Sequence, residues 1–323
     1  MEITYIAEIG NNHNGNIDVA KKMAEAAIAA GADYIKFQIY KTDQFIEKNG
    51  QFYDEFSQEQ LSYDEFKALK RYVESLGGKF LATPFDIDSL EFIAGLDVDA
   101  IKIASGDMNN WPLLEKLLQY KKKIFISVGG WSINEIDEIV SFLDKKEARF
   151  SILHCIISYP SQFEELNLRF IPFLEKKYQK EIGFSDHSLG IEGSLAAIAL
   201  GATIIEKHFT IDKSLPGGDN SMSIEPDEFK RLKFEGDNIA LALGSENKCL
   251  SENEMATKKI ISRFFYASRD ISAGAVVSPI DLVALRGENS LNGIPVEQYY
   301  NLIGKRTKVL VSKHSLINSS FFE

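Results

Sequence analysis

The hydrophobic positions along the first three-quarters of the chain follow two alternating periods. Short runs rich in β-branched and aromatic residues, such as 34–40 (YIKFQIY), have the two-residue period of strands. Longer amphipathic runs between them, such as 63–78 (YDEFKALKRYVESLGG), have the period of helices. The pattern predicts eight strands, at residues 4–10, 34–40, 80–85, 100–106, 123–129, 150–158, 181–187 and 203–210.

The order of these elements predicts the fold class. Helical patterns follow the strands, for example at residues 18–32, 63–78, 133–145 and 225–244. Eight strand–helix units within about 240 residues match the size and order of a (β/α)8 TIM barrel, an α/β fold. In such barrels the active-site groups lie at the carboxyl ends of the strands.

The alternation stops near residue 245, which predicts a domain boundary. We expect a barrel over residues 1–245 and a polar linker over 246–260. Residues 261–323 contain short strand-like runs broken by Gly, Pro and Asn, which predicts a small β-rich domain.

Composition narrows the classes of partner. The 323 residues carry a formal net charge of −11, which argues against a nucleic-acid or acidic-membrane partner. An anionic ligand must then be held locally by lysines or a metal ion. Cys155 and Cys249 are far apart in sequence, no run predicts a signal peptide or a membrane span, and we expect a cytoplasmic protein.

Polar residues recur on one face of the predicted strands. The run 203–211 (TIIEKHFTI) places Glu206 and His208 on one face and Lys207 on the other, toward the helices. The same face, near the same strand ends, carries Glu8, Lys36, Gln38, Thr83, Lys102, Ser127, Ser185 and His187. Because an unpaired buried charge costs several kcal/mol, this convergence predicts a functional site inside the barrel.

The residue types indicate the chemistry of that site. His187 and His208 end adjacent strands, each with a neighbouring carboxylate, Asp186 or Glu206, and two imidazoles suit a divalent transition-metal ion. Two lysines with hydroxyls suit a phosphate or a carboxylate; these residues are Lys36, Lys102, Thr83, Ser105, Ser127 and Ser185. Two further carboxylates, Glu8 and Asp219, could contact metal-bound water or sugar hydroxyls.

Each group also has a structural interpretation. A histidine in a strand is often a hydrogen-bonded core residue. The inward lysines could form structural ion pairs with Glu8 or Glu206. Rim hydroxyls could bond only to loop backbone. The sequence pattern leaves both interpretations open for each residue taken alone.

Several motifs together resemble one known family. They include AEIGNNHNG (7–15), IKIASGD (101–107), FSDHSLG (184–190) and EKHFTID (206–212), with further matches into the C-terminal tail. In this order they resemble the sialic acid (nonulosonic acid) synthase family, in which a barrel is followed by a small antifreeze-like domain. The resemblance implies condensation of phosphoenolpyruvate with an N-acylated amino sugar, N-acetylmannosamine or a diacetamido relative, to a nine-carbon α-keto acid. It also implies a divalent metal ion, Mn²⁺ or Mg²⁺.

The resemblance assigns roles residue by residue. His187 and His208 match metal ligands. The residues that match the phosphoenolpyruvate-binding set are Lys36, Thr83, Lys102, Ser105, Ser127 and Ser185. Those that match groups contacting the sugar or metal-bound water are Glu8, Gln38, Tyr159, Glu206 and Asp219. Arg286 matches an arginine that contacts the sugar's acyl group from the partner subunit, which implies a domain-swapped homodimer.

The chain departs from the family pattern in four places. Ile157 stands where a hydroxyl or amide residue is common. Gly287 and Glu288 follow Arg286 in place of Pro-Gly, and Asp107 replaces a common glutamate. The loop over residues 41–61 is also short for the family, which predicts an unusual sugar pocket.

The expected mechanism uses the metal to polarise the sugar aldehyde while the lysines hold phosphoenolpyruvate, whose C3 attacks the aldehyde carbon. Water then adds at C2 and phosphate leaves by C–O cleavage. The expected catalytic residues are Glu8, Glu206 and Lys102, and either glutamate could transfer the protons. Two alternatives stay open: a Schiff-base aldolase with Lys102 as nucleophile, and a catalytically inactive sugar-binding protein.

Overall fold

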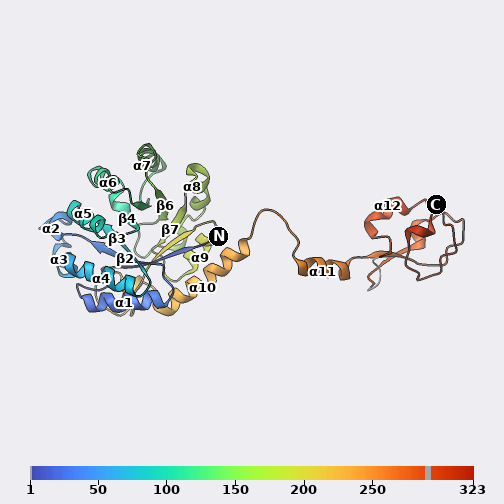
Figure 1. Ribbon diagram of the computed structural model, residues 1–323, viewed down its shortest axis with the longest axis horizontal. Helices are drawn as coiled ribbons and strands as arrows, with labels where there is room; N and C mark the ends of the chain where they lie inside the picture. Colours follow the sequence, from blue (N-terminus) through green and yellow to red (C-terminus); the bar gives the residue numbers. More distant parts are fainter. Residues whose placement is uncertain (1, 288–291) are drawn as a thin grey trace. The chain divides into compact units, whose positions relative to one another are not determined.

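The computed structural model describes residues 2–287 and 292–323, which form two units, Met1–Gly244 and Ser245–Glu323 (Figure 1). Glu288, one of the departures from the family pattern, lies outside the described residues. Within the described ranges, no helix is both long and apolar enough to cross a bilayer.

The first unit is a nearly closed barrel of eight parallel strands. The strands are β1 (Thr4–Gly10), β2 (Tyr34–Ile39), β3 (Lys79–Pro84), β4 (Ala100–Ile103), β5 (Lys123–Ser127), β6 (Phe150–Cys155), β7 (Ile182–Asp186) and β8 (Ile204–His208). Hydrogen-bonded neighbours follow the order β3-β2-β1-β8-β7-β6-β5-β4. The two end strands, β3 and β4, lie beside each other, but among the described residues no ladder joins them. The predicted TIM-barrel class is confirmed.

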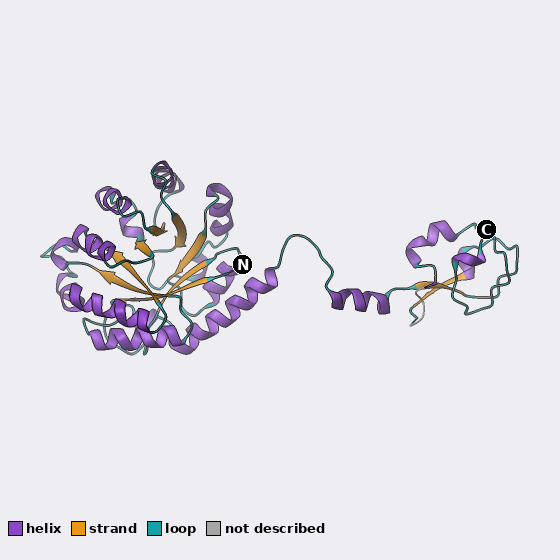
Figure 2. Cartoon of the chain, viewed as in Figure 1, coloured by secondary structure: helices purple, strands orange, loops and turns teal. Residues whose placement is uncertain are grey.

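Helices surround the strands on the outside (Figure 2). They are α1 (Ile17–Ala29), α2 (Thr42–Phe45), α3 (Tyr53–Glu59), α4 (Tyr63–Ser75), α5 (Ile87–Gly95), α6 (Trp111–Leu118), α7 (Ile133–Lys145), α8 (Phe170–Tyr178), α9 (Glu192–Ala199) and α10 (Pro226–Leu243). Ser62 and Ser132 begin α4 and α7 with capping boxes, in which Glu65 and Glu135 return the hydrogen bond. The short helices α2 and α3 lie in the loop over residues 41–61.

The barrel interior has an apolar floor beneath a polar layer. Seven buried side chains from seven strands form a separate inner cluster: Ile6, Tyr34, Leu81, Ala100, Phe125, Leu153 and Ile204. Two residues further along their strands, Glu8, Lys36, Thr83, Lys102, Ser127 and Glu206 take the inward positions. The register places Glu8 opposite both Lys36 and His208, and Ser185 opposite Glu206. The two-residue period therefore places the polar side chains in one layer.

Seven of the eight strands end before their hydrophobic runs do, and the largest differences are at β4 and β6. The run at 100–106 ends as a strand at Ile103, and a 3-10 helix follows at Ser105–Asp107. The run at 150–158 ends as a strand at Cys155. Glycine and aspartate favour turns over strands, which explains the first difference.

The second unit is small and has its own core. A helix, α11 (Glu252–Ile261), occupies much of the polar segment after the barrel, and Ser251 caps it. The strands β9 (Phe264–Ala267) and β10 (Leu282–Leu285) pair antiparallel, and α12 (Tyr299–Leu302) follows. Its buried core is formed by Phe265, Ala267, Ile271, Val277, Ile294, Leu302, Val311, Ile317 and Phe322.

Candidate active site

A pocket of about 330 Å³ opens at the carboxyl ends of the barrel strands. Every site residue predicted from the first unit lines it: Glu8, Lys36, Gln38, Thr83, Lys102, Ser105, Ser127, Tyr159, Ser185, His187, Glu206, His208 and Asp219. Arg286 is not in this lining; it follows β10 in the second unit, and its side chain is exposed. Strand parity predicted ten of these side chains, whereas Ser105 and Asp219 were chosen for their residue types and Tyr159 matched the family motif.

Lys36 lies between two carboxylates deep in the pocket. Its Nζ is 3.0 Å from Glu8 Oε2 and 3.0 Å from Glu206 Oε1, and all three side chains are buried. Gln38 donates a 3.0 Å hydrogen bond to Glu8, and Ser185 donates one of 2.9 Å to Glu206. The structural ion pair considered for Lys36 therefore exists, within a larger polar network.

The two glutamates have opposite pKa shifts. Burial raises the pKa of Glu8, and the attraction of Lys36 does not offset it. Burial also acts to raise the pKa of Glu206, but Lys102 and Lys36 outweigh it and lower that pKa. Two nearby carboxyls with separated pKa values can serve as an acid and a base.

Lys102 contributes the second ammonium group. Its Nζ donates to Ser127 Oγ at 2.7 Å and to the Ile103 carbonyl at 3.1 Å, and it lies 3.9 Å from Glu206 Oε1. Burial lowers the pKa of Lys102. A lysine that loses its proton more readily also meets the first requirement of a Schiff-base nucleophile, so this geometry is compatible with both enzyme hypotheses.

Two hydroxyls of the predicted set, those of Ser105 and Thr83, differ in their hydrogen bonding. Ser105 Oγ accepts a 3.0 Å hydrogen bond from the Gly129 amide, so it is engaged with loop backbone. Thr83 Oγ1 is buried and has no hydrogen-bond partner in the described chain. Because buried polar groups are nearly always paired, we expect water or a ligand to bond the Thr83 hydroxyl.

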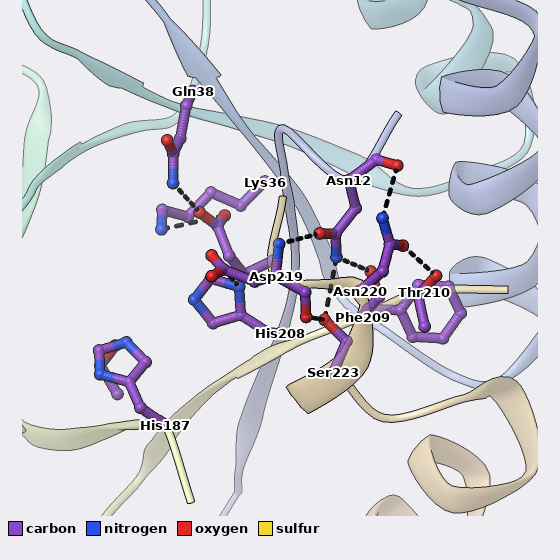
Figure 3. Close-up of polar contacts among 12 residues, drawn as sticks. Asn12, Lys36, Gln38, His187, His208, Phe209, Thr210, Asp219, Asn220 and Ser223 are labelled. Carbon is purple, nitrogen blue, oxygen red and sulfur yellow. Dashed lines mark hydrogen bonds and ion pairs between the residues drawn. The ribbon is translucent and has the colours of Figure 1, made fainter. Parts of the chain in front are cut away.

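His187 and His208 lie next to each other in the lining of the pocket, with their ring centroids 5.3 Å apart (Figure 3). His187 Nδ1 donates a 2.6 Å hydrogen bond to the Ile156 carbonyl. Since a carbonyl only accepts, this tautomer leaves Nε2 with a free lone pair. His208 Nδ1 is buried without a hydrogen bond and lies 3.3 Å from Asp219 Oδ2.

This arrangement fits a metal ion only in part. Burial lowers the pKa of both histidines, that of His208 to about 3, so both are neutral near pH 7 and can act as ligands. Across residues 2–287 and 292–323, no group of three or more His, Cys, Asp and Glu side chains is placed to hold a metal ion. Two imidazoles beside Asp219 would leave positions open for water or substrate, as catalytic sites do.

Asp186 faces away from His187, although the two are adjacent in sequence. Its carboxylate lies 3.1 Å from Lys207 Nζ on the outer face of the strands. It also accepts 2.6 Å hydrogen bonds from the hydroxyls of Ser188 and Ser194. Strand alternation explains this placement, so Asp186 supports the outer packing and does not contact the histidine.

Sequence reasoning missed several residues of the site. Asn12 is buried, and its Oδ1 accepts a 2.8 Å hydrogen bond from the Asp219 amide (Figure 3). Its Nδ2 donates at 2.9 Å both to the Phe209 carbonyl and to Ser223 Oγ. In the sequence, Asn12 stands out only as a member of the GNNHNG run, in the loop between a strand and a helix. No local pattern assigns it to the site.

Five more lining residues were left out of the predicted set: Phe85, Ala104, Gly106, Cys155 and Ile157. The two-residue period over the predicted runs 80–85, 100–106 and 150–158 already places all five on the inward face. They are apolar, small or weakly polar, whereas the predicted set was drawn from polar side chains. Burial raises the pKa of Cys155 to about 11, so its thiol is not an activated nucleophile.

Known proteins resemble this chain over most of its length. The model of the NeuB family matches residues 23–248, and that of the SAF domain matches residues 262–323. An N,N'-diacetyllegionaminic acid synthase of Campylobacter jejuni is 36% identical, with 93% of this chain and 94% of that protein covered. Human N-acetylneuraminate-9-phosphate synthase is 35% identical, with 97% and 90% covered.

Solved structures extend the comparison. The crystal structure of an N-acetylneuraminic acid synthetase from Leptospira borgpetersenii, in complex with citrate, has a TM-score of 0.77 and 37% sequence identity. The match covers 80% of this chain and 90% of that one.

Proposed function

The chain belongs to the NeuB family, and from that premise we propose that it condenses phosphoenolpyruvate with an open-chain N-acylated amino sugar. The product would be a nine-carbon α-keto acid, released with inorganic phosphate. Relatives named for legionaminic, N-acetylneuraminic and pseudaminic acids support this reaction class. The observation that best supports this proposal is that two lysines, two histidines and a hydroxyl without a partner in the described chain line one pocket.

Phosphoenolpyruvate would bind at the lysines. Lys36 and Lys102 offer two buried ammonium groups for its phosphate and carboxylate. Thr83 has a free hydroxyl, and Ser127 and Ser185 have acceptor sites left after their present hydrogen bonds. The negative charges of the ligand would attract the Lys102 ammonium and so oppose the burial that now lowers its pKa.

His187 and His208 would hold a divalent ion, Mn²⁺ or Mg²⁺, with Asp219 beside them. Such an ion, when bound, polarises the aldehyde oxygen of the sugar. The hydrogen bond from His187 to the Ile156 carbonyl fixes its ring orientation and keeps Nε2 unprotonated.

The two glutamates would transfer protons in the reaction. A bond forms between C3 of phosphoenolpyruvate and the aldehyde carbon, and the aldehyde oxygen takes a proton. Glu8, with its raised pKa, suits the donor, and Glu206, with its lowered pKa, suits the base that takes a proton from the water adding at C2. The C2–O bond to phosphate then breaks, the C2 hydroxyl gives its proton to the leaving phosphate, and the ketone forms.

The direct test measures phosphate release from phosphoenolpyruvate by the full chain with Mn²⁺, across a panel of N-acylated amino sugars. We expect sugar-dependent release, and its absence with every sugar would favour the inactive sugar-binding alternative. Borohydride added with a carbonyl substrate tests the aldolase alternative. Covalent trapping on Lys102 would contradict the proposed mechanism, because direct condensation forms no imine.

A further inference from the structure

The loop that carries Asp219 is held through its backbone. Residues 216–221 (PGGDNS), here called the glycine loop, follow β8, and Gly217 and Gly218 have φ values of +71° and +50°. Side chains rarely adopt such values. Asn12 accepts the hydrogen bond from the Asp219 amide, and a Cβ added to Gly218 would lie 2.9 Å from Asn12 Oδ1. The glycine loop is therefore fixed by side chains from other segments.

Glu59, the last residue of α3, is a second side chain that lies against this loop. Its carboxylate accepts a hydrogen bond from the Gly218 amide, and a Cβ added to Gly217 would lie 3.4 Å from its Oε1. The side-chain amide of Asn11, in the loop after β1, also donates to it. Glu59 is buried, at 7% exposure. One buried carboxyl thus joins the loop over residues 41–61 to the glycine loop and to the loop after β1.

The residues on both sides of Glu59 are anchored, so Glu59 can act as a support. Gln60 Oε1 accepts 2.8 Å hydrogen bonds from both the amide and the hydroxyl of Thr42. The Gln58 carbonyl packs so closely on Gly15 that a Cβ there would collide with it. The position of Glu59 therefore does not depend on the glycine loop alone.

The Glu59 carboxylate has no ion-pair partner in the described part of the chain. Glu55, on the same helix, and Asp219, in the glycine loop, both repel its negative charge. Tyr40, after β2, is kept protonated by burial, and Asn11 is neutral. Burial raises the pKa of Glu59 to about 7, and the two carboxylates add to the shift. A cation at the histidines would offset the effect of Asp219, while the larger effect of burial would remain.

We propose that Glu59 is a positioning residue, which holds the glycine loop and, through its backbone, the Asp219 carboxylate beside His208. This inference rests on the proposed condensation, in which Asp219 contacts the amino sugar or metal-bound water. Two consecutive amides of the loop are fixed, that of Gly218 by Glu59 and that of Asp219 by Asn12. The Asp219 carboxylate, 3.3 Å from His208 Nδ1, is thus set from two sides.

The neutral and ionised forms of Glu59 should hold the loop unequally. If the loop moves away, water reaches the carboxyl, and its pKa returns from about 7 toward the ordinary 4.5. The closed loop therefore binds a proton more tightly than the open one. Its stability is complete below the open-state pKa and falls as the pH rises to about 7. A neutral carboxyl still accepts from the Gly218 amide through its carbonyl oxygen.

The kinetic experiment compares wild type, Glu59→Gln and Glu59→Ala in phosphate release between pH 5.5 and 8.5, with saturating phosphoenolpyruvate and Mn²⁺. Glutamine has the same length, keeps an oxygen for the Gly218 amide and does not titrate. Glu59→Gln should match wild type at pH 5.5 and have a severalfold lower KM for the amino sugar at pH 8.5. Glu59→Ala loses the acceptor and should lose roughly 10-fold in kcat/KM for the sugar at every pH.

Hydrogen exchange gives a measurement that does not depend on turnover. In Glu59→Ala, amides of residues 216–221 should exchange faster than in wild type at the same pH, measured by mass spectrometry, while Glu59→Gln should stay close to wild type. The increase should be confined to the loops that Glu59 joins. Faster exchange throughout the barrel would mean a general loss of stability and would contradict a positioning role.

Glu47→Ala and Glu47→Gln are the matched controls. Glu47 is an exposed glutamate in the same loop over residues 41–61, and its side chain has no hydrogen bond or ion pair in the described chain. Both variants should leave the sugar KM, its pH dependence and the exchange unchanged.

Unchanged KM and exchange in Glu59→Ala would overturn the inference and leave the condensation standing. A sugar KM in Glu59→Gln that follows wild type at every pH would overturn the dependence on the protonation of Glu59. No phosphate release with any amino sugar would overturn the proposed function. The exchange of the glycine loop would then still decide whether Glu59 holds it.

Discussion

The backbone amide of Asp219 donates a 2.8 Å hydrogen bond to the side-chain oxygen of Asn12, although 207 positions separate the two residues. The same asparagine donates to the carbonyl of Phe209, the residue that follows His208. One buried side chain therefore joins the loop after β1 to both ends of the segment that carries His208 and Asp219. We expect Asn12 to set the position of Asp219 against His208.

Replacement of Asn12 should reduce activity through this arrangement. Asn12→Ala should lower kcat roughly 10- to 100-fold and weaken Mn²⁺ binding, because it removes the support of groups beside the histidines. Asn12→Asp keeps an oxygen that accepts the hydrogen bond from the Asp219 amide. Its losses in kcat and in Mn²⁺ binding should therefore be smaller. Asn14→Gly is the control, since Asn14 contacts the same loop through Pro216 and has a φ of +48° that glycine adopts freely. Equal losses in Asn14→Gly would contradict a specific role for Asn12.

The metal assignment can be tested apart from activity. His187→Ala and His208→Ala should each weaken Mn²⁺ binding, measured by titration with electron paramagnetic resonance, while exposed His314→Ala should not. Because burial lowers the pKa of His208 to about 3, its ring stays neutral from pH 7 to 5. Binding should hold across that range, where an ordinary imidazole would become protonated. Unchanged binding in both alanine variants would refute the assignment.

A domain-swapped dimer, which the family resemblance implies, would allow complementation between two inactive variants. Arg286→Ala removes a group proposed to serve the partner's pocket, and Lys102→Ala disables the pocket of its own chain. Mixed subunits would contain one pocket with both residues intact, so mixing under exchange conditions should restore part of the activity. If Arg286 serves its own pocket, every mixed site lacks one group, and no activity should return.

The two cysteines should differ in reactivity. Cys249 is exposed, whereas Cys155 is buried and its pKa is raised to about 11. At pH 8 the Cys155 thiol is therefore protonated, and its alkylation should be slow and should accelerate as pH rises. Iodoacetamide labelling followed by mass spectrometry should modify Cys249 first, and Cys249→Ser should remove the fast phase. Rapid labelling of Cys155 at pH 7 would contradict the buried, neutral thiol.

The outer pair of Asp186 and Lys207 should matter for stability. Lys207→Met leaves the buried Asp186 carboxylate without its cation, which should cost about 3–5 kcal/mol in the free energy of unfolding. Arg231→Met breaks an exposed ion pair with Glu235 and should cost less than about 1 kcal/mol. Denaturant unfolding measures both changes. Similar losses in the free energy of unfolding for the two variants would mean that the buried pair stabilises the protein no more than the exposed pair does.

Much of the fold and the site could be predicted because both depend on short-range periodicity. A two-residue period decides which side of a strand a residue faces, so Lys36 and Glu206 were predicted to share the barrel interior without knowledge of their contact. The same reasoning separates Glu206 from Lys207, which pairs with Asp186 outside. The helices that cover the strands likewise follow from amphipathic runs.

The remaining features depend on contacts between distant loops. No local pattern indicates that Asn12 binds the Asp219 amide, because the partners meet only after the barrel closes. The opposite pKa shifts of Glu8 and Glu206 depend on the position of Lys36 and Lys102, which a strand pattern does not give. The position of Ile157 likewise depends on the glycines after β5, which leave room for its side chain.

The missing ladder between β3 and β4 has a consequence for how the barrel moves. Thr83, on β3, lies on one side of that seam and Lys102, on β4, lies on the other, so two residues proposed to hold phosphoenolpyruvate stand on neighbouring strands that no ladder joins in the described part of the chain. Widening there would disturb the packing between the two strands but would not break a strand ladder. The wall beside the reacting groups is thus the place where the barrel can expand while the other seven strand pairs stay intact.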